Sequence, residues 1–174
     1  ETVVATGEGL SRFTSDPAEK HEGQRSVRID ADEVTRSYLR SNPISVAPGE
    51  RLRVSAWVKT RDVPAAKGMV IIIADFFEGA SRVGEGPTKV NVAKAVPNWQ
   101  RIEGEVIVPP GADGMRLRFG FSYAQGTSWW DEVMVQSGGS VAVQPIIHEN
   151  RLFPAMKTLS VRLLNRKGIT GEIQ

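Results

Sequence analysis

The sequence has 174 residues, 40% hydrophobic and 24% charged, a balance that excludes a disordered chain and suits one folded domain with some additional chain. The formal net charge of +2 gives no reason to expect a nucleic-acid partner, and the lack of cysteine excludes disulfides and thiolate zinc sites. The longest apolar run, Met69 to Ala74, is far too short to cross a bilayer, so we expect no membrane partner.

Apolar and polar residues alternate from residue 26 onward, which is the pattern of strands with one face on a core. The first two such stretches lie at residues 26–30 and 36–46. The turn-forming sequence Ala-Pro-Gly-Glu at 47–50 separates them from a third stretch at 52–59. Residues 69–77 and 89–93 are predicted to form further strands.

The second half of the main region follows the same pattern. Residues 99–108 and 115–123 alternate, and Pro-Pro-Gly at 109–111 forms a predicted turn between them. Gln-Gly-Thr at 125–127 is predicted to be another turn, before a strand near Trp129. No stretch combines helical apolar periodicity with capping residues. About eight or nine short strands at regular spacing predict an all-β fold, an antiparallel β-sandwich of jelly-roll type.

Small residues indicate a domain boundary near the C-terminal end. Ser-Gly-Gly-Ser at 137–140 is typical of a flexible linker. We expect a main domain at 1–136, a linker at 137–157 and, at 158–174, the first hairpin of a following β domain that stops short. A lone hairpin is marginally stable, so it should lean on the main sandwich. The chain opens at Glu1 without a methionine, which suggests that its true start has been removed.

Four stretches carry a family resemblance. They are H-E-G-Q-R-S-V-R-I at 21–29, V-A-P-G-E-R-L-R-V-S-A-W-V-K at 46–59, Trp99 followed by V-P-P-G-A at 108–112, and G-T-S-W-W-D-E-V at 126–133. In order and spacing they resemble the carbohydrate-binding modules of families four, nine and twenty-two, in the galactose-binding-like jelly-roll superfamily. The resemblance covers residues 2–136. It implies two packed antiparallel sheets, with a polysaccharide bound on the concave face of the sheet that contains residues 36–46, 69–77, 89–93 and 115–123.

Alternation then predicts which side chains on that sheet face a ligand. The candidate sugar-binding residues are Arg36, Tyr38, Arg40, Asp75, Asn91, Arg116 and Arg118. Guanidinium and amide groups hydrogen-bond sugar hydroxyls, and an exposed tyrosine ring can stack on a sugar. Because arginine also pairs bidentately with carboxylate or sulfate, its abundance favours an anionic polysaccharide. The alternative is a solvated face of weak ion pairs that binds nothing.

The resemblance also implies a structural calcium. In many relatives the aspartate at the position of Asp131 is a calcium ligand, and loop carbonyls such as those of His21 and Gln24 complete the site. The alternative is an aspartate that only caps a turn. We expect Trp57 and Trp99 to pack on the sheet away from the ligand. Of the adjacent Trp129 and Trp130, one should face the core and the other outward.

No catalytic constellation is apparent in the sequence. It has two histidines far apart and no Ser/His/Asp set, zinc-ligand spacing or phosphate loop. Carboxylate pairs such as Glu103 and Glu105 alternate on one strand, as on any solvated face. We expect a non-catalytic polysaccharide-binding module, an accessory domain of a larger secreted glycoside hydrolase. The alternative is a structural β-sandwich that packs against neighbouring domains of the same chain without binding sugar.

Overall fold

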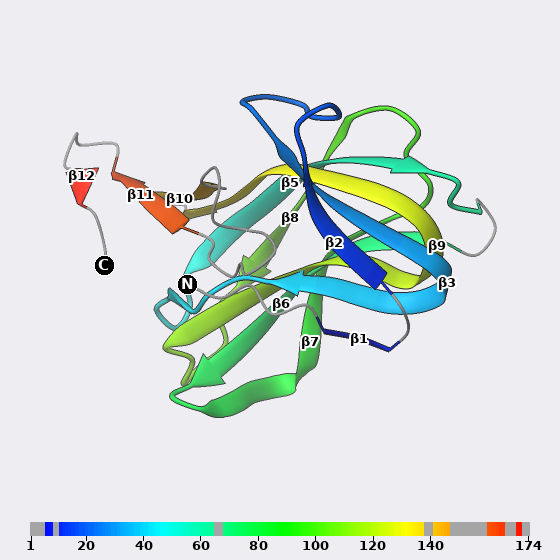
Figure 1. Cartoon of the computed structure of the whole chain (residues 1–174). Helices are drawn as coiled ribbons and strands as arrows, with labels where there is room; N and C mark the ends of the chain where they lie inside the picture. The colour runs from blue at the N-terminus through cyan, green and yellow to red at the C-terminus, as the bar shows by residue number, and fades with distance from the viewer. Residues whose placement is uncertain are drawn as a thin grey trace.

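The computed structural model describes residues 6–8, 11–64, 68–137, 141–146, 160–165 and 170–171, with side chains for 11–64, 68–84 and 86–137. Within these ranges no helix is long and apolar enough to cross a membrane. The strands are β1 (Thr6–Glu8), β2 (Ser11–Asp16), β3 (Ser26–Arg40), β4 (Ile44–Ser45), β5 (Arg51–Arg61), β6 (Met69–Glu78), β7 (Ser81–Ala93), β8 (Gln100–Ile107), β9 (Gly114–Ser137), β10 (Val141–Ile146), β11 (Ser160–Asn165) and β12 (Thr170–Gly171). All of them except β4 are labelled in Figure 1.

Two long strands, β3 and β9, run through both layers of the sandwich and lie side by side in Figure 1. Residues 114–122 of β9 pair with β6, and residues 118–124 pair with 35–40 of β3. Residues 126–137 of β9 instead pair with β5 and with 27–31 of β3. The chain thus forms a front sheet, ordered β1-β3-β9-β6-β7, and a back sheet, ordered β2-β3-β9-β5-β8. This is the predicted antiparallel β-sandwich of jelly-roll type.

The predicted turn at 125–127 is wrong, because β9 continues through these residues and bends instead of reversing. Tyr123 and Gly126 have φ angles of +53° and +110°, which bend the strand where it passes from front to back sheet. A Cβ on Gly126 would lie 2.7 Å from the carbonyl oxygen of Arg61, so glycine is required for this close approach. Strand β3 bends at the same level, with shifted register between Ala31 and Arg36.

The other two predicted turns are confirmed by their hydrogen bonds. The N–H of Glu50 donates to the carbonyl of Ala47 at 3.0 Å, and the N–H of Ala112 donates to that of Pro109 at 3.3 Å. The predicted assignment of strands to sheets is also confirmed, since residues 36–40, 69–77, 89–93 and 115–123 lie in the front sheet. The stretch predicted at 36–46 is not one strand, however: β3 ends at Arg40, and the separate β4 pairs with β9 through Ile44 and Ser45.

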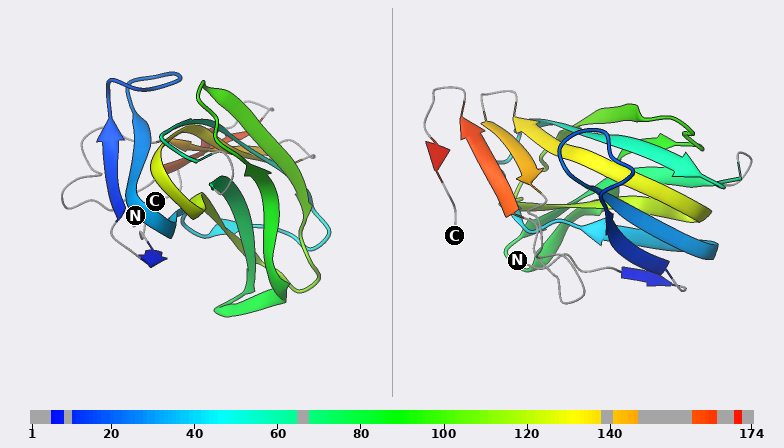
Figure 2. Two further views of the ribbon diagram at one scale, coloured as in Figure 1. Left: turned by 90° about the vertical axis from the view of Figure 1, so that its right-hand side faces the viewer. Right: turned by 45° about the horizontal axis from the view of Figure 1, so that its top comes forward.

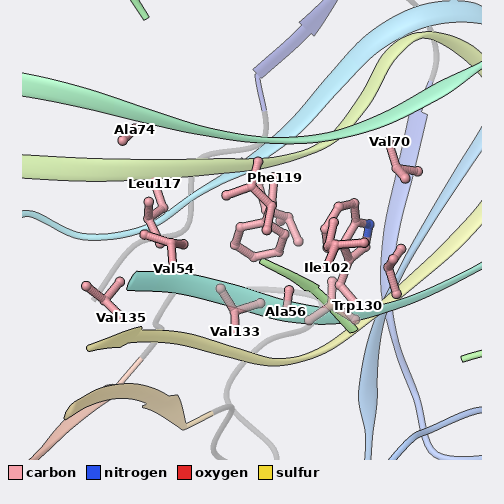
Figure 3. Close-up of a cluster of buried hydrophobic side chains, with 14 of the residues drawn as sticks. Val54, Ala56, Val70, Ala74, Ile102, Leu117, Phe119, Trp130, Val133 and Val135 are labelled. Carbon is pink, nitrogen blue, oxygen red and sulfur yellow. The ribbon is translucent and has the colours of Figure 1, made fainter. Parts of the chain in front are cut away.

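The apolar members of each alternation meet between the two sheets. Trp130 is fully buried near the middle, with its ring centroid 5.4 Å from that of Phe119. Figure 3 shows the surrounding side chains, with Val70, Ala74, Leu117 and Phe119 from the front sheet and Val54, Ala56, Ile102, Val133 and Val135 from the back sheet. Full burial of one large apolar side chain stabilises a fold by roughly 1.5–3 kcal/mol, so this core fixes the outward direction of the alternate residues.

Strands β10 to β12 extend the sheet beyond the end of β9 (Figure 2). Strand β10 lies inside the range predicted to be a linker and pairs with β9 through Ala142–Gln136 and Val143–Val135. It forms a hairpin with β11, which pairs with β12. The predicted domain boundaries stay predictions.

Candidate ligand-binding face

The outer surface of the front sheet brings together every predicted sugar-binding residue except Asn91. Leu39, Leu117 and Ala74 point into the core, so their strand neighbours point away from it. Arg40 pairs in register with Arg118, and Asp75 with Arg116. We call this surface the arginine face; its members are Arg36, Tyr38, Arg40, Asp75, Phe77, Arg82, Lys89, Arg116, Arg118 and Tyr123.

Asp75 organises the centre of the arginine face. Its side chain is 6% exposed and accepts two hydrogen bonds from Arg118, from Nε to Oδ2 at 2.5 Å and from Nη2 to Oδ1 at 3.0 Å. Nη2 of Arg82 donates to Oδ1 as well. Such bidentate pairs hold a guanidinium in one orientation. The buried carboxylate therefore positions two arginines on this face.

Tyr38 lies under this ion-pair network. It is 8% exposed and packs against Ile71 and Ile73, and Cζ of Arg118 lies 5.4 Å from its ring centroid. Beside it, Gly120 has a φ of +151°, and a Cβ there would lie 2.0 Å from the carbonyl oxygen of Ser37. The close approach of β3 and β9 keeps the tyrosine in place. Little of the ring is free, so Tyr38 supports Arg118 more than it offers a stacking surface.

Two further arginine–aromatic contacts flank the centre. Tyr123 is 52% exposed, and Cζ of Arg36 lies 4.0 Å from its ring centroid. Toward the other end of β9, Cζ of Arg116 lies 5.5 Å from the ring of Phe77. Sequence reasoning missed Tyr123, because simple alternation groups it with the core residues of β9. Its positive φ turns the side chain outward, and the only signal nearby is Gly126.

Asn91 does not lie on the arginine face, contrary to the prediction. The register pairs Ile72 with Asn91 but Ile73 with Lys89, which leaves Val90 as an extra residue in a bulge. Asn91 therefore shares the core side with Ile72, and its Nδ2 donates to the carbonyl of Glu103 at 2.8 Å. It ties β7 to β8 of the back sheet, while Lys89 takes the outward position.

The ion pairs leave the arginine face with an excess of positive charge. Among the described side chains, the pairs on this face are those of Arg118 and Arg82 with Asp75. Arg36, Arg40 and Arg116 are in no ion pair within the part of the chain that the structure describes. Since arginine stays charged at all ordinary pH values, these three groups keep the described part of the face cationic.

The outer side of the back sheet is occupied by structural contacts. The rings of His21 and Trp57 stack with centroids 3.7 Å apart, and Trp99 meets His21 edge-on at 5.9 Å. As predicted, Trp129 and Trp130 point in opposite directions. Trp129 is only 3% exposed although it faces outward, because cationic side chains contact its ring: Arg28, Lys59 and Arg61.

The surroundings of Asp131 do not fit calcium. Its Oδ2 accepts hydrogen bonds from the backbone N–H groups of His21 and Glu22, at 2.9 and 3.2 Å, and its Oδ1 accepts from that of Glu132 at 2.9 Å. Calcium is bound by oxygens, whereas here N–H donors face the carboxylate. Within the described ranges, no group of three or more His, Asp or Glu residues could hold a metal ion. The geometry agrees with the alternative, a carboxylate that caps the loop.

Several solved structures share this fold. The C-terminal family 22 carbohydrate-binding module of Clostridium thermocellum Xyn10B has a TM-score of 0.59 and 14% identity over 78% of this chain and 86% of that one. A family 22 xylan-binding domain of Paenibacillus barcinonensis Xyn10C has a TM-score of 0.56 and 15% identity, over 76% of this chain and 85% of that domain. Tailspike protein 4 of bacteriophage CBA120 has a TM-score of 0.59 and 16% identity over 78% of this chain but 19% of the tailspike.

No protein-family model matches the chain, and no curated protein matches it either. At the identities above, the structural likeness establishes the fold, a jelly roll of the kind found in carbohydrate-binding modules, and the function has to be argued from the chain's own residues.

Proposed function

We propose that this chain is a non-catalytic polysaccharide-binding module and that the arginine face holds the glycan. The observation that carries the proposal is a row of arginine–aromatic pairs along one sheet. They are Arg36 with Tyr123, Arg118 with Tyr38, and Arg116 with Phe77. The pairs of Arg36 and Arg116 offer planar hydrogen-bond donors beside a ring, which suits the hydroxyl groups and the C–H surface of a sugar ring, while Tyr38 packs beneath Arg118 and supports it.

The face is preorganised for such a ligand. Asp75 holds Arg118 and Arg82 in fixed orientations, and Tyr38 packs beneath Arg118. Ordering a free, rotamer-rich side chain on binding costs about 0.5–1.5 kcal/mol, and a side chain that is already ordered avoids most of this cost. The sheet can therefore bind an extended chain without rearrangement.

The charge of the face favours an acidic polysaccharide. Arg36, Arg40 and Arg116 lack an ion-pair partner among the described residues, and the carboxylate of Asp75 is shared by two guanidinium groups. A uronate or sulfate group on the glycan would form charge-assisted hydrogen bonds with these arginines. We therefore propose a uronate- or sulfate-bearing polymer as the ligand.

The fold supports a place in a larger secreted glycan-degrading enzyme. One similar structure, from C. thermocellum xylanase 10B, is described as a family 22 module together with a GH10 module, in complex with xylohexaose. We propose the same kind of arrangement here, in which the module holds an attached hydrolase near its substrate and performs no chemistry itself.

A structural role beside a neighbouring domain is the second candidate. It is favoured by the pairing of β10 with β9, which joins the sandwich to further strands. The two candidate functions can be distinguished because a purely structural module would bind no glycan.

Affinity electrophoresis of the whole chain tests the proposal, with xylan as the neutral polymer and polygalacturonate and dextran sulfate as the acidic ones. We expect retardation by an acidic polymer, weakened by added salt because ions screen exposed charges. Arg36→Gln and Tyr123→Asn should each weaken binding about tenfold, the loss of a contact of about 1.4 kcal/mol. Asparagine at position 123 tolerates the positive φ, so the ring is removed without new backbone strain.

The matched control is Arg53→Gln, which makes the same charge change on the back sheet, where Arg53 pairs with Glu105. It should leave retardation unchanged. No retardation by any of the three polymers would refute glycan binding and support the structural role; an equal loss in Arg53→Gln would show that overall charge, and not the arginine face, is responsible.

A further inference from the structure

A hollow of about 630 Å³ lies at one end of the arginine face. This volume is within the range of ligand pockets, roughly 300–1,000 Å³. Strand β4 borders it on one side, and the turn between β6 and β7 borders it at the end. Its lining includes Ser45, Phe77, Ala80, Asp113, Gly114 and Arg116.

Like the arginine face, the hollow presents an arginine beside an aromatic ring, and it also has a carboxylate that can accept hydrogen bonds. Arg116, half-buried and in no ion pair within the described residues, contributes donors beside the ring of Phe77. The carboxylate of Asp113 accepts the N–H of Gly79, at 3.0 Å to Oδ1 and 3.2 Å to Oδ2. Each of these oxygens has a second lone pair to offer. A guanidinium, a carboxylate and a ring around one space suit a single sugar residue, whose hydroxyls both donate and accept.

Gly114 keeps the floor of the hollow open. It pairs in register with Ser45 on one side and Phe77 on the other, on the outward side of β9. A Cβ built on Gly114 would meet nothing within 4 Å. Any larger side chain there would project into the space between Ser45 and Phe77, so the volume depends on this glycine.

The arginine face stops at this hollow. The N–H of Asp113 donates to the carbonyl of Phe77 at 2.9 Å, and Asp113 in turn accepts from Gly79. These bonds tie the β6–β7 turn to the residues before β9, and both segments line the hollow. A glycan that lies along β9 from Tyr123 toward Arg116 reaches the hollow and its lining at Gly79 and Ala80.

We infer that the hollow binds the terminal sugar residue of the glycan, so that the module recognises chain ends rather than chain interiors. The inference rests on the proposed function, because it assigns one end of the same binding face. It adds that the glycan lies on the face in one direction, with its terminal residue in the hollow lined by Gly79 and Ala80.

The first test counts the binding sites that a polymer offers. Isothermal titration measures how many protein molecules one gram of polygalacturonate binds, before and after the polymer is cut into shorter chains of the same total mass. Recognition of ends predicts a capacity that rises in proportion to the number of chains. A capacity independent of chain length would overturn the inference while leaving glycan binding intact, and no binding of polygalacturonate in either form would overturn it too.

The second test fills the hollow with Gly114→Leu. Its affinity for a short galacturonate oligosaccharide should fall at least tenfold, whereas Arg53→Gln should bind as the unchanged protein does. Wild-type affinity in a folded Gly114→Leu would overturn the inference. The titration of capacity uses the unmodified chain, so it decides the question even if this variant does not fold.

Discussion

Asp75 is the residue on which the centre of the arginine face depends. Its buried carboxylate is shared by the guanidinium groups of Arg118 and Arg82. Removing one partner from a buried ion pair leaves an uncompensated charge, and this costs more than the intact pair contributes. A single carboxylate therefore holds together a region that is otherwise dominated by repulsion between arginines.

Asp75→Asn should lower the free energy of unfolding by about 2–3 kcal/mol, somewhat less than a fully buried pair because the Arg82 side chain is 42% exposed. The midpoint of urea unfolding measures this change. In Glu105→Gln, which loses only an exposed pair with Arg53, the shift should stay within about 0.5 kcal/mol. Equal shifts in the two variants would contradict the central role of Asp75.

Asp16 makes stability depend on pH. Burial by itself raises the pKa of Asp16, but hydrogen bonds from the Trp129 indole and from the N–H groups of Glu19 and Ala18, together with the charge of Arg28, outweigh it and lower the pKa below the ordinary 3.8. The folded state therefore binds this proton less readily than the unfolded chain. The contribution of Asp16 to stability is present above about pH 3.8 and is lost as the pH falls through the lower folded-state pKa.

Asp16→Asn should consequently be less stable than the unchanged protein at pH 6, and the difference should shrink as the pH falls below 3.8. Urea unfolding of both proteins across this range gives the comparison. A difference that stays the same at every pH would show that the charge of Asp16 contributes nothing.

Alternation correctly predicts the outward direction of Tyr38, Arg40 and Arg118, because these residues lie in regular parts of β3 and β9. It fails at Asn91 and Tyr123. A bulge at Val90 moves Asn91 to the core side of β7, and a positive φ turns the side chain of Tyr123 outward. Both irregularities depend on how the strands pair in the folded chain, and the alternation of apolar and polar residues does not reveal them.

At the scale of the element, β9 shows how one strand serves two sheets. It has 24 residues, and its glycines have different tasks. Gly120 lies where β3 passes close to β9, and a Cβ there would lie 2.0 Å from a backbone oxygen of Ser37. Gly114 faces open space. The same substitution should therefore lower stability strongly at Gly120 and hardly at all at Gly114.

Gly120→Ala should destabilise the fold by about 2 kcal/mol or more, because β3 has to move and alanine disfavours the positive φ. Gly114→Ala should change stability by no more than about 0.5 kcal/mol. Thermal unfolding of the pair measures the contrast. Similar stabilities would show that β3 can shift away from β9 at little cost.

The sequence indicates where strands begin better than how far they extend. Pro-Gly turns at 48–49 and 110–111 are visible in it, and both are present in the structure. The bend in β9 resembles a turn in the sequence because Gly126 suits either. Only the pairing of β9 with β3 and β5 on both sides keeps the chain extended there.

At the scale of the whole molecule, the sharing of β3 and β9 couples the two sheets. All four tryptophans belong to the back sheet or the loop before it: Trp57 on β5, Trp99 before β8, and Trp129 and Trp130 on β9. Tryptophan fluorescence thus reports on the back sheet and, through the contact of Trp130 with Phe119, on the core between the sheets, whereas far-ultraviolet circular dichroism reports on the backbone of both sheets. Neither sheet can lose β9 without disrupting the other.

We expect urea unfolding curves from the two methods to coincide, as in a two-state transition. Gly120→Ala, a change in the front sheet, should lower both midpoints equally, although every tryptophan is elsewhere. A fluorescence midpoint that stays in place while the circular dichroism midpoint falls would show that the sheets unfold separately.

The jelly roll itself is the part of the structure that the sequence predicts best, since two apolar faces of short strands can be buried only against each other. The hollow beyond Phe77 is the part it predicts least. Its walls come from β4, the β6–β7 turn and the residues before β9, which are brought together only by the folded chain.

The continuity of β9 also has a mechanical consequence. One end of the strand floors the hollow at Gly114, and the other pairs with β10 at Gln136. Tension between a bound polymer and the chain that follows would act along the axis of β9, which is also the axis of its antiparallel neighbours β3, β5 and β6. Backbone hydrogen bonds perpendicular to the strands then carry the load together, in shear, instead of opening one after another. The strand pairing therefore opposes separation under such tension.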